Sequence, residues 1–226
     1  MKIYKRHAWD TDLPTARTLQ QELRSKLELR PLPQMPQIVA GADISYSPKN
    51  TLSFAAVLLF DFKNMQIIET ARHIDKTGFP YISGYLTFRE GPLLLTVFEK
   101  LENIPDVIIF DGQGIAHQRR MGIAAHLGLF LQVPTIGCAK KRLVGTFDEP
   151  GLEMGEWSPL IHQNEIIGAA VRTRKNTKPV FVSPGHLCNV PDAIQIVLQC
   201  CHRYRIPEPT RQAHLLVNQM RKEYQT

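Results

Sequence analysis

Residues 106–122 read DVIIFDGQGIAHQRRMG, and this stretch holds the pattern that decides the fold. The run VIIF at 107–110 is apolar throughout, which is typical of a strand buried on both faces. It ends at Asp111, and two glycines, a histidine and a pair of arginines follow before residue 121. A buried strand therefore leads a carboxylate into a flexible, basic loop.

Length, composition and charge narrow the class of protein. The chain has 226 residues with 43% hydrophobic content, a net charge of +6 and a pI of about 9.2. No apolar run approaches the ~20 residues of a membrane span, and the basic N-terminus lacks the apolar core of a signal peptide. We expect one soluble, cytoplasmic domain over 1–226 with reduced cysteines and no membrane partner. The positive charge favours a polyanion as the partner.

The elements around VIIF alternate between the two periodicities of secondary structure. The sequence predicts helices near 13–29, 91–102, 119–130, 190–204 and 209–223, and strands at 38–46, 52–60, 65–73, 107–110, 133–139, 166–172 and 179–183. Short turns join the first three strands, which implies an antiparallel meander. Strands separated by helices pair in parallel. The expected fold is α/β: a ribonuclease H-like mixed sheet of three antiparallel strands and then parallel strands, flanked by helices.

Three carboxylates stand at positions where a metal site is plausible in this fold. Asp43 interrupts the apolar strand IVAGADISY, where an unpaired carboxylate is costly, and Asp111 ends VIIF. If those strands are neighbours, both carboxylates reach one spot, with Glu90 nearby before the next helix. Oxygen ligands of this kind suit Mg²⁺, and phosphate oxygens complete such a site. The pattern favours phosphodiester cleavage.

Each carboxylate also has a simpler interpretation. Asp43 could face solvent at the sheet edge, and Asp111 before a glycine could form a turn. The segment TFRE matches a capping box with Thr87 as N-cap and Glu90 reaching back, although Pro92 favours a later helix start. These alternatives stay open from spacing alone.

Three further side chains and one loop are candidates. His117 could contact a phosphate, Lys140 could hold one after the strand 133–139, and His214 lies in a terminal helix. The alternatives are a hydrogen-bonded loop histidine, an exposed lysine and, for His214, a surface or packed histidine. Three aromatics in FPYISGY at 79–85 either stack on bases or fold onto the core.

Six segments in order resemble the endonuclease V family, the deoxyinosine 3′ endonucleases, over about residues 10–214. They are VAGADISY (39–46), PYISGYLTFRE (80–90), PDVIIFDGQGIAHQRRMGIAAHLGL (105–129), VPTIGCAKKRL (133–143), VSPGH (182–186) and PEPTRQAH (207–214). The resemblance implies the ribonuclease H-like fold, recognition of hypoxanthine in DNA, and a nick one nucleotide to its 3′ side. It implies a requirement for Mg²⁺, for which we expect Mn²⁺ to substitute.

The resemblance also assigns roles to residues. Asp43 and Asp111 correspond to metal ligands, Glu90 to a third carboxylate acting directly or through water, His214 to a member of the same site, and Lys140 to the residue at the cleaved phosphate. These five are the expected catalytic residues. For His214 the resemblance reverses the preference for a surface or packed histidine.

A wedge, a base pocket and a set of phosphate contacts complete the expected site. Tyr81, with Pro80 and Ile82, corresponds to a wedge that fills the gap left by a displaced base. The base pocket is expected to be walled by Gly84, Leu86, Gly112, Ile123, Gly137 and Ala139. We expect phosphate contacts from His117, Arg119 and Lys140. Two residues depart from the family pattern: Ser83 replaces the second proline of PYIPG, and Gln113 replaces the histidine of DGHG.

Three other functions compete with the nicking of inosine-containing DNA. The first is cleavage of RNA that contains inosine, with a contact to the 2′-hydroxyl. The second is a ribonuclease H-like module that binds nucleic acid without cutting, against which the three carboxylates argue. The third is a phosphatase of small molecules, which the basic clusters and loop aromatics disfavour.

Overall fold

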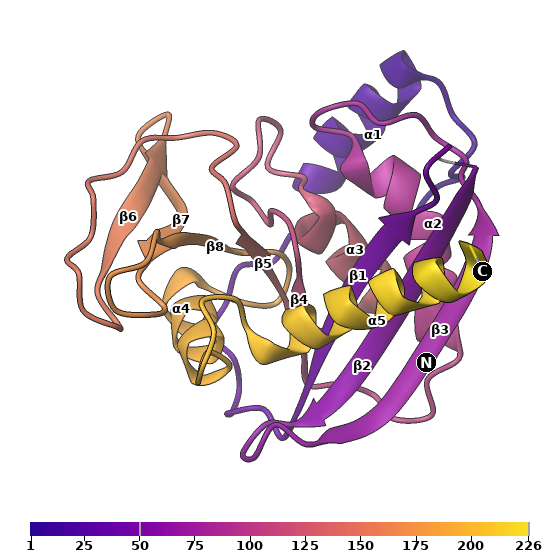
Figure 1. Cartoon of the computed structure of the whole chain (residues 1–226). Coiled ribbons are helices and arrows are strands. Elements are labelled where there is room, and N and C mark those ends of the chain that lie inside the picture. The colour runs from indigo at the N-terminus through magenta and orange to yellow at the C-terminus, as the bar shows by residue number, and fades with distance from the viewer. Residues whose placement is uncertain (50, 226) are drawn as a thin grey trace.

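The computed structural model describes residues 1–49 and 51–225, so residues 50 and 226 of the expected domain lie outside it. The elements are α1 (Leu13–Arg24), β1 (Ile38–Tyr46), β2 (Leu52–Asp61), β3 (Ile67–Lys76), α2 (Leu86–Glu99), β4 (Val107–Phe110), α3 (Ile123–Leu131), β5 (Thr135–Ala139), β6 (Trp157–His162), β7 (Glu165–Val171), β8 (Val180–Pro184), α4 (Val190–Gln199) and α5 (Glu208–Gln225). Figure 1 shows one sheet with helices packed against it.

The strand order of the sheet is β3-β2-β1-β4-β5-β8-β7-β6. The first three strands are antiparallel, and β1, β4 and β5 are parallel, which confirms the predicted arrangement. Beyond β5 the sheet continues with antiparallel β8, β7 and β6. The sequence did not predict β6, because Pro159 interrupts its pattern; proline is tolerated there since β6 is the edge strand.

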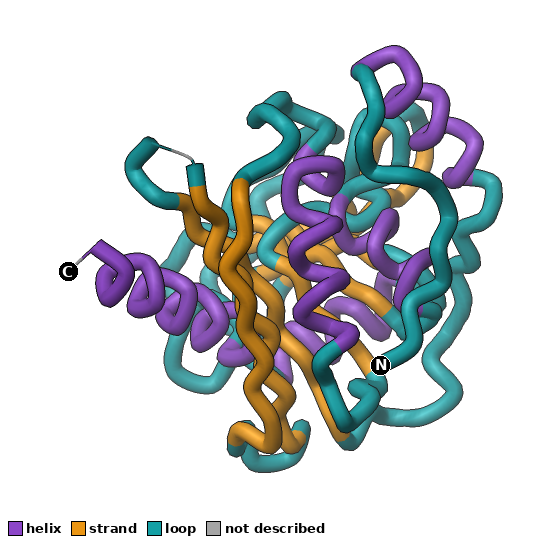
Figure 2. Tube along the Cα trace, turned by 90° about the vertical axis from the view of Figure 1, so that its right-hand side faces the viewer, coloured by secondary structure: helices purple, strands orange, loops and turns teal. Residues whose placement is uncertain are grey.

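Alternating side chains on the first strands build a separate core on each face of the sheet. On β2, Phe54, Ala56 and Leu58 join the core with α4 and α5, whereas Ala55 and Val57 join the core with α2 and α3. Figure 2 shows α5 on one side of the strands and helices on the other. The parallel part of the sheet is therefore covered on both faces, as its continuous apolar strands require.

Helix α2 begins earlier than the sequence predicts. It runs from Leu86, its N-cap is Tyr85 without a side-chain cap bond, and Pro92 lies inside it. Both proposed starts, a cap at Thr87 and a first turn at Pro92, are therefore wrong. The first turn is buried, and Phe88 in it is 1% exposed. The free energy gained by this burial outweighs the cost of the hydrogen bond that is lost because proline has no backbone N–H. Glu90 consequently lies within the helix.

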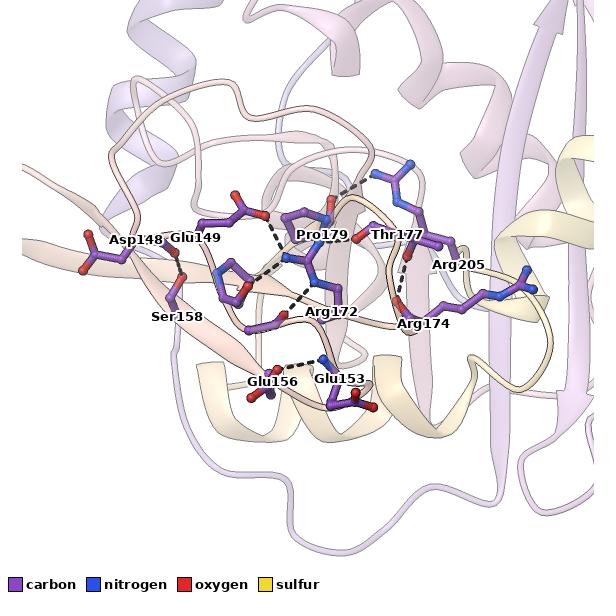
Figure 3. Close-up of polar contacts among 12 residues, drawn as sticks. Asp148, Glu149, Glu153, Glu156, Ser158, Arg172, Arg174, Thr177, Pro179 and Arg205 are labelled. Carbon is purple, nitrogen blue, oxygen red and sulfur yellow. Dashed lines mark hydrogen bonds and ion pairs between the residues drawn. The ribbon is translucent and has the colours of Figure 1, made fainter.

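A buried arginine holds the loop before β6 against the end of β7. Arg172 is 3% exposed and donates to Glu149 and to the carbonyl of Pro150, both at 2.8 Å. It also donates to the carbonyls of Gly151 and Thr177 (Figure 3). The guanidinium therefore has an acceptor on several sides, one of them a carboxylate.

A second buried arginine explains why α3 starts at Ile123 and not at 119. Arg120 has a left-handed backbone with φ of 58°, which interrupts any helix there. Its side chain, 5% exposed as a residue, donates to Glu165 at 2.8 Å and to the His162 carbonyl at 3.0 Å. These bonds dock the β6–β7 turn on the loop that follows β4.

The predictions about membrane-spanning helices and about the cysteines can be compared with the structure of the described residues. No helix among them is long and apolar enough to span a membrane. All four cysteines are free and buried, as predicted. Burial raises the pKa of the Cys188 thiol to about 12, which keeps it protonated and unreactive.

Candidate active site

The register of two parallel strands brings the aspartates together. Strand β1 pairs with β4 so that Ala42 lies beside Phe110. Asp43 and Asp111 are each the next residue, so they are neighbours at the same edge of the sheet. The two carboxylates interact electrostatically, and the charge of Asp111 helps burial to raise the pKa of Asp43 to about 6. The strands of Asp43 and Asp111 are therefore neighbours, as the predicted metal site requires.

Glu90 approaches the aspartates from helix α2. It is partly buried and accepts a hydrogen bond from the Tyr46 hydroxyl at 2.9 Å. Burial is the largest cause that raises the pKa of Glu90, to about 8, and the charges of Asp43 and Asp111 act in the same direction. Three carboxylates from three elements therefore share one electrostatic environment, which disfavours their charged forms because like charges repel.

His214 reaches Asp43 because α5 crosses very close to β1. A Cβ on Gly41 would lie 2.1 Å from the Pro209 carbonyl carbon, so only glycine permits this approach. One turn further along α5, His214 Nδ1 is 2.7 Å from the Asp43 carboxylate. Asn218 lies 3.1 Å from the other ring nitrogen of His214. The structure thus places His214 beside Asp43, although its side chain is more than half exposed.

Lys140 lies at the end of β5, next to the end of β4. Its ammonium donates to Asp111 and forms an ion pair with it. The Lys140 side chain is 44% exposed, so it is accessible to a phosphate. The structure therefore brings together all five residues expected to be catalytic, while their roles remain predictions.

The three carboxylates are not arranged around a common point at which a metal ion could bind. Over residues 1–49 and 51–225, no three His, Cys, Asp or Glu side chains are arranged to hold an ion. Asp43, Glu90 and Asp111 are engaged instead with His214, Tyr46 and Lys140 in turn. The donor set nevertheless fits a hard divalent cation, because it is all oxygen and carries excess negative charge at neighbouring positions.

A cavity of about 330 Å³ opens next to the carboxylates. Four of the six residues expected to wall the base pocket line it, namely Gly84, Leu86, Gly112 and Ile123. Gly137 and Ala139 lie on β5 and are not among its lining residues. Tyr81 and Ile82 of the expected wedge also line this cavity, and Gly112 directly follows Asp111.

The wedge loop, residues 79–84, is fixed firmly at its C-terminal end. Gly84 has a φ of 83°, and its carbonyl accepts hydrogen bonds from Gln20 at 3.0 Å, His117 at 3.0 Å and Arg119 at 2.9 Å. Tyr81 in the middle of the loop is 72% exposed. A rigid end with an exposed aromatic tip is what a side chain inserted between bases requires.

Two of the three predicted phosphate contacts face inward in the structure. His117 is 3% exposed, and burial with the nearby arginines lowers its pKa to about 4, so the ring is neutral. Arg119 is bonded to Gln20 at 2.6 Å as well as to Gly84. Their contact with phosphate stays a prediction; the structure gives both a role in holding the wedge loop.

Sequence reasoning did not identify three residues that support the site. Gln113 donates to the Lys141 carbonyl at 3.0 Å and so links the loops after β4 and β5. Tyr46 bonds to Glu90, and Arg89 lies over the Tyr46 ring. A signal existed for each, since Tyr46 ends the strand of Asp43, Arg89 precedes Glu90 and Gln113 departs from the family pattern.

Known proteins are similar to this chain in both sequence and fold. The family model of endonuclease V matches residues 21–215. An endonuclease V of Trichormus variabilis is 47% identical over 96% of this chain and 99% of its own. The Bacillus subtilis endonuclease V, known from a crystal structure, is 32% identical to this chain with a TM-score of 0.94. The match covers 100% of this chain and 99% of that one.

A relative has also been crystallised with nucleic acid. The endonuclease V of Ciona intestinalis, in complex with a 24mer DNA containing an inosine followed by a ribo-adenosine, is 31% identical with a TM-score of 0.81. The match covers 94% of this chain and 98% of that one. These similarities extend over nearly the full length and include the segments that build the carboxylate site. The chain therefore belongs to the endonuclease V family.

Proposed function

We propose that this protein is an Mg²⁺-dependent endonuclease that recognises hypoxanthine in DNA and nicks the strand one nucleotide to its 3′ side, leaving a 3′-hydroxyl and a 5′-phosphate. The observation that carries the proposal is the position of the cavity. It begins at Gly112, one residue beyond Asp111, and ends at the wedge loop. A base held there would place its own strand beside the carboxylates.

The side chains of this site suit phosphodiester hydrolysis. Asp43 and Asp111 would hold the cation, with Glu90 acting directly or through water. When bound, Mg²⁺ supplies a Lewis acid for phosphate oxygens and lowers the pKa of water. Lys140, which is paired with Asp111, would offset with its ammonium the negative charge that grows on the phosphate. His214 orients Asp43 through the hydrogen bond between them.

The cavity has the properties expected for a base. Its walls combine apolar side chains such as Leu86, Met121 and Ile123 with backbone around Gly84 and Gly112. The Ciona complex supports inosine as the target, because that relative was crystallised with an inosine-containing strand. The ribo-adenosine that follows the inosine there is a specific reason to consider RNA with inosine as the second candidate substrate.

One set of strands tests both candidates. Single-stranded DNA, duplex DNA and RNA, each with one inosine, are incubated with Mg²⁺, with Mn²⁺ or with Ca²⁺ as a non-supporting ion, beside inosine-free controls. We expect cutting of inosine strands with Mg²⁺ and Mn²⁺. Equal cutting of the controls would refute inosine recognition, and binding without cutting in any metal would indicate a non-catalytic module.

A further inference from the structure

Glu90 is attached to the strand that carries Asp43. Tyr46 lies three residues after Asp43 on β1, and its hydroxyl donates to Glu90 at 2.9 Å. Because side chains alternate along a strand, Asp43 faces α5 while Tyr46 faces α2. A single strand thus fixes one aspartate directly and the glutamate through a tyrosine hydroxyl.

The Tyr46 ring is in turn held by the residue next to Glu90. The guanidinium carbon of Arg89 lies 4.2 Å from the centre of the Tyr46 ring, a distance typical of a cation–π contact. This contact fixes the ring plane and hence the direction of the hydroxyl. Arg89 and Glu90 therefore both contact Tyr46, Arg89 at the face of the ring and Glu90 at the hydroxyl oxygen.

Arg89 also holds the N-terminal end of the wedge loop. Its Nη1 donates to the Phe79 carbonyl at 2.8 Å, and Phe79 lies two residues before Tyr81. The Phe79 ring packs on Phe88 with 5.8 Å between centres. This end of the loop has the one charged donor Arg89, whereas the Gly84 carbonyl has three donors. Arg89 therefore connects the Phe79 end of the loop to the carboxylate site.

We propose that Tyr46 is a positioning residue for Glu90 and that Arg89 links this position to the wedge loop. The proposal rests on the proposed function, because it assigns Glu90 to the cation and residues 79–84 to the wedge. When Tyr81 enters a duplex and the loop shifts, the Phe79 carbonyl moves Arg89, and Arg89 moves the ring that holds Glu90. The carboxylate site is then completed in step with wedge insertion.

Removal of one hydroxyl tests the first half of the proposal. Tyr46→Phe keeps the ring under Arg89 but loses the bond to Glu90. Mn²⁺ binding to the protein without nucleic acid, followed by electron paramagnetic resonance, should weaken by about tenfold or more, as is typical when the partner of a metal ligand is lost. The Mg²⁺ concentration for half-maximal nicking should rise similarly, while binding of an inosine strand in Ca²⁺ and the melting temperature stay unchanged.

The chain offers a matched control for this variant. Tyr204 lies under Arg211 with 4.1 Å between the guanidinium carbon and the ring centre, the same kind of pair at another position. Tyr204→Phe should leave both Mn²⁺ binding and nicking as in the wild type. If Tyr46→Phe binds Mn²⁺ as tightly as Tyr204→Phe does, the positioning role is refuted.

Arg89→Gln tests the link to the wedge loop. It should slow the nicking of inosine-containing duplex DNA more than that of single strands, because the wedge inserts between bases only in a duplex. Combined with Tyr46→Phe, it should add less to the loss of Mn²⁺ affinity than it causes alone, since both act through one contact. Equal slowing on both substrates, or additive losses, would overturn the link.

Different results on the wild-type protein would overturn the proposed substrate and the role of Tyr46. A wild-type protein that binds Mn²⁺ but cuts no inosine strand would refute the proposed substrate, and the Tyr46→Phe binding result would still decide the positioning role. A wild-type protein that binds no Mn²⁺ would refute the metal site together with the role of Tyr46.

Discussion

Two regions of this molecule bury charge in opposite ways. Around Asp43, Glu90 and Asp111, three carboxylates are gathered beside one ammonium, that of Lys140, and the pKa values of Asp43 and Glu90 rise to about 6 and about 8. The Arg172 guanidinium meets a carboxylate and backbone carbonyls in hydrogen-bond contact (Figure 3). The Arg120 guanidinium has the same two kinds of partner.

The difference separates a site from a structural contact. A buried charge with its own partners contributes to the fold and leaves nothing for a ligand to add. Like charges held together cost stability until a partner arrives from outside. The carboxylate cluster is therefore the region whose stability should respond to a cation, and the arginine region the one whose stability should not.

The largest expected effect is on activity at the carboxylate cluster. Asp43→Asn removes one negative charge and should reduce nicking of an inosine strand by more than about a hundredfold, beyond the loss typical of residues that only support a ligand. The melting temperature of the metal-free protein should not fall, because repulsion from Asp111 and Glu90 is relieved. Wild-type nicking by this variant would contradict the role of Asp43.

The largest expected effect on stability is in the arginine region. Arg172→Met keeps the apolar stem but leaves backbone carbonyl groups without their donor, whereas the Glu149 carboxylate is 62% exposed and becomes solvated. The free energy of unfolding should therefore fall by about 1–3 kcal/mol and the melting temperature by roughly 2–10 °C. Arg174→Met, at an exposed position on the same loop, is the control. A thermal melt that does not distinguish the two variants would show that Arg172 contributes little.

The pH dependence of stability should show the strain among the carboxylates. The folded pKa of Glu90, about 8, is above its unfolded value of 4.5, so its contribution is full at low pH and is lost as pH rises through the folded pKa. In EDTA, the free energy of unfolding should decrease by about 1–2 kcal/mol between pH 6.5 and 8. Urea denaturation should show Glu90→Gln without this slope, and Mg²⁺ should reverse the loss in the wild type.

The smallest effect is expected for the exposed partner of a buried arginine. Glu165→Gln removes the carboxylate that Arg120 contacts, but the His162 and His117 carbonyls still accept from the guanidinium. Its melting temperature should stay close to that of the wild type, since an exposed ion pair contributes little. A loss as large as that of Arg172→Met would mean that the carboxylate, and not the carbonyl groups, stabilises such an arginine.

Much of the site was predictable because apolar runs in the sequence indicate the strands and the polar residues that interrupt or end them. Asp43 interrupts an apolar strand and Asp111 ends another, and two parallel strands in register must place them together. The start of α2 was not predictable, since burial of Phe88 and its neighbours overrides the local signal of Pro92. The inward turn of His117 was also hidden, because its partner at Gly84 is 33 residues away in the chain.

The sequence by itself determined the order of the strands and helices other than β6, the candidate carboxylates and the family, because periodicity and motifs are local properties of the chain. Only the tertiary structure decided which charges have partners. It paired Lys140 with Asp111, joined Tyr46 to Glu90 and Arg89, and turned His117 and Arg119 toward the wedge loop. Hydrogen bonds and ion pairs form between residues far apart in sequence, and their geometry exists only once the sheet and helices have packed.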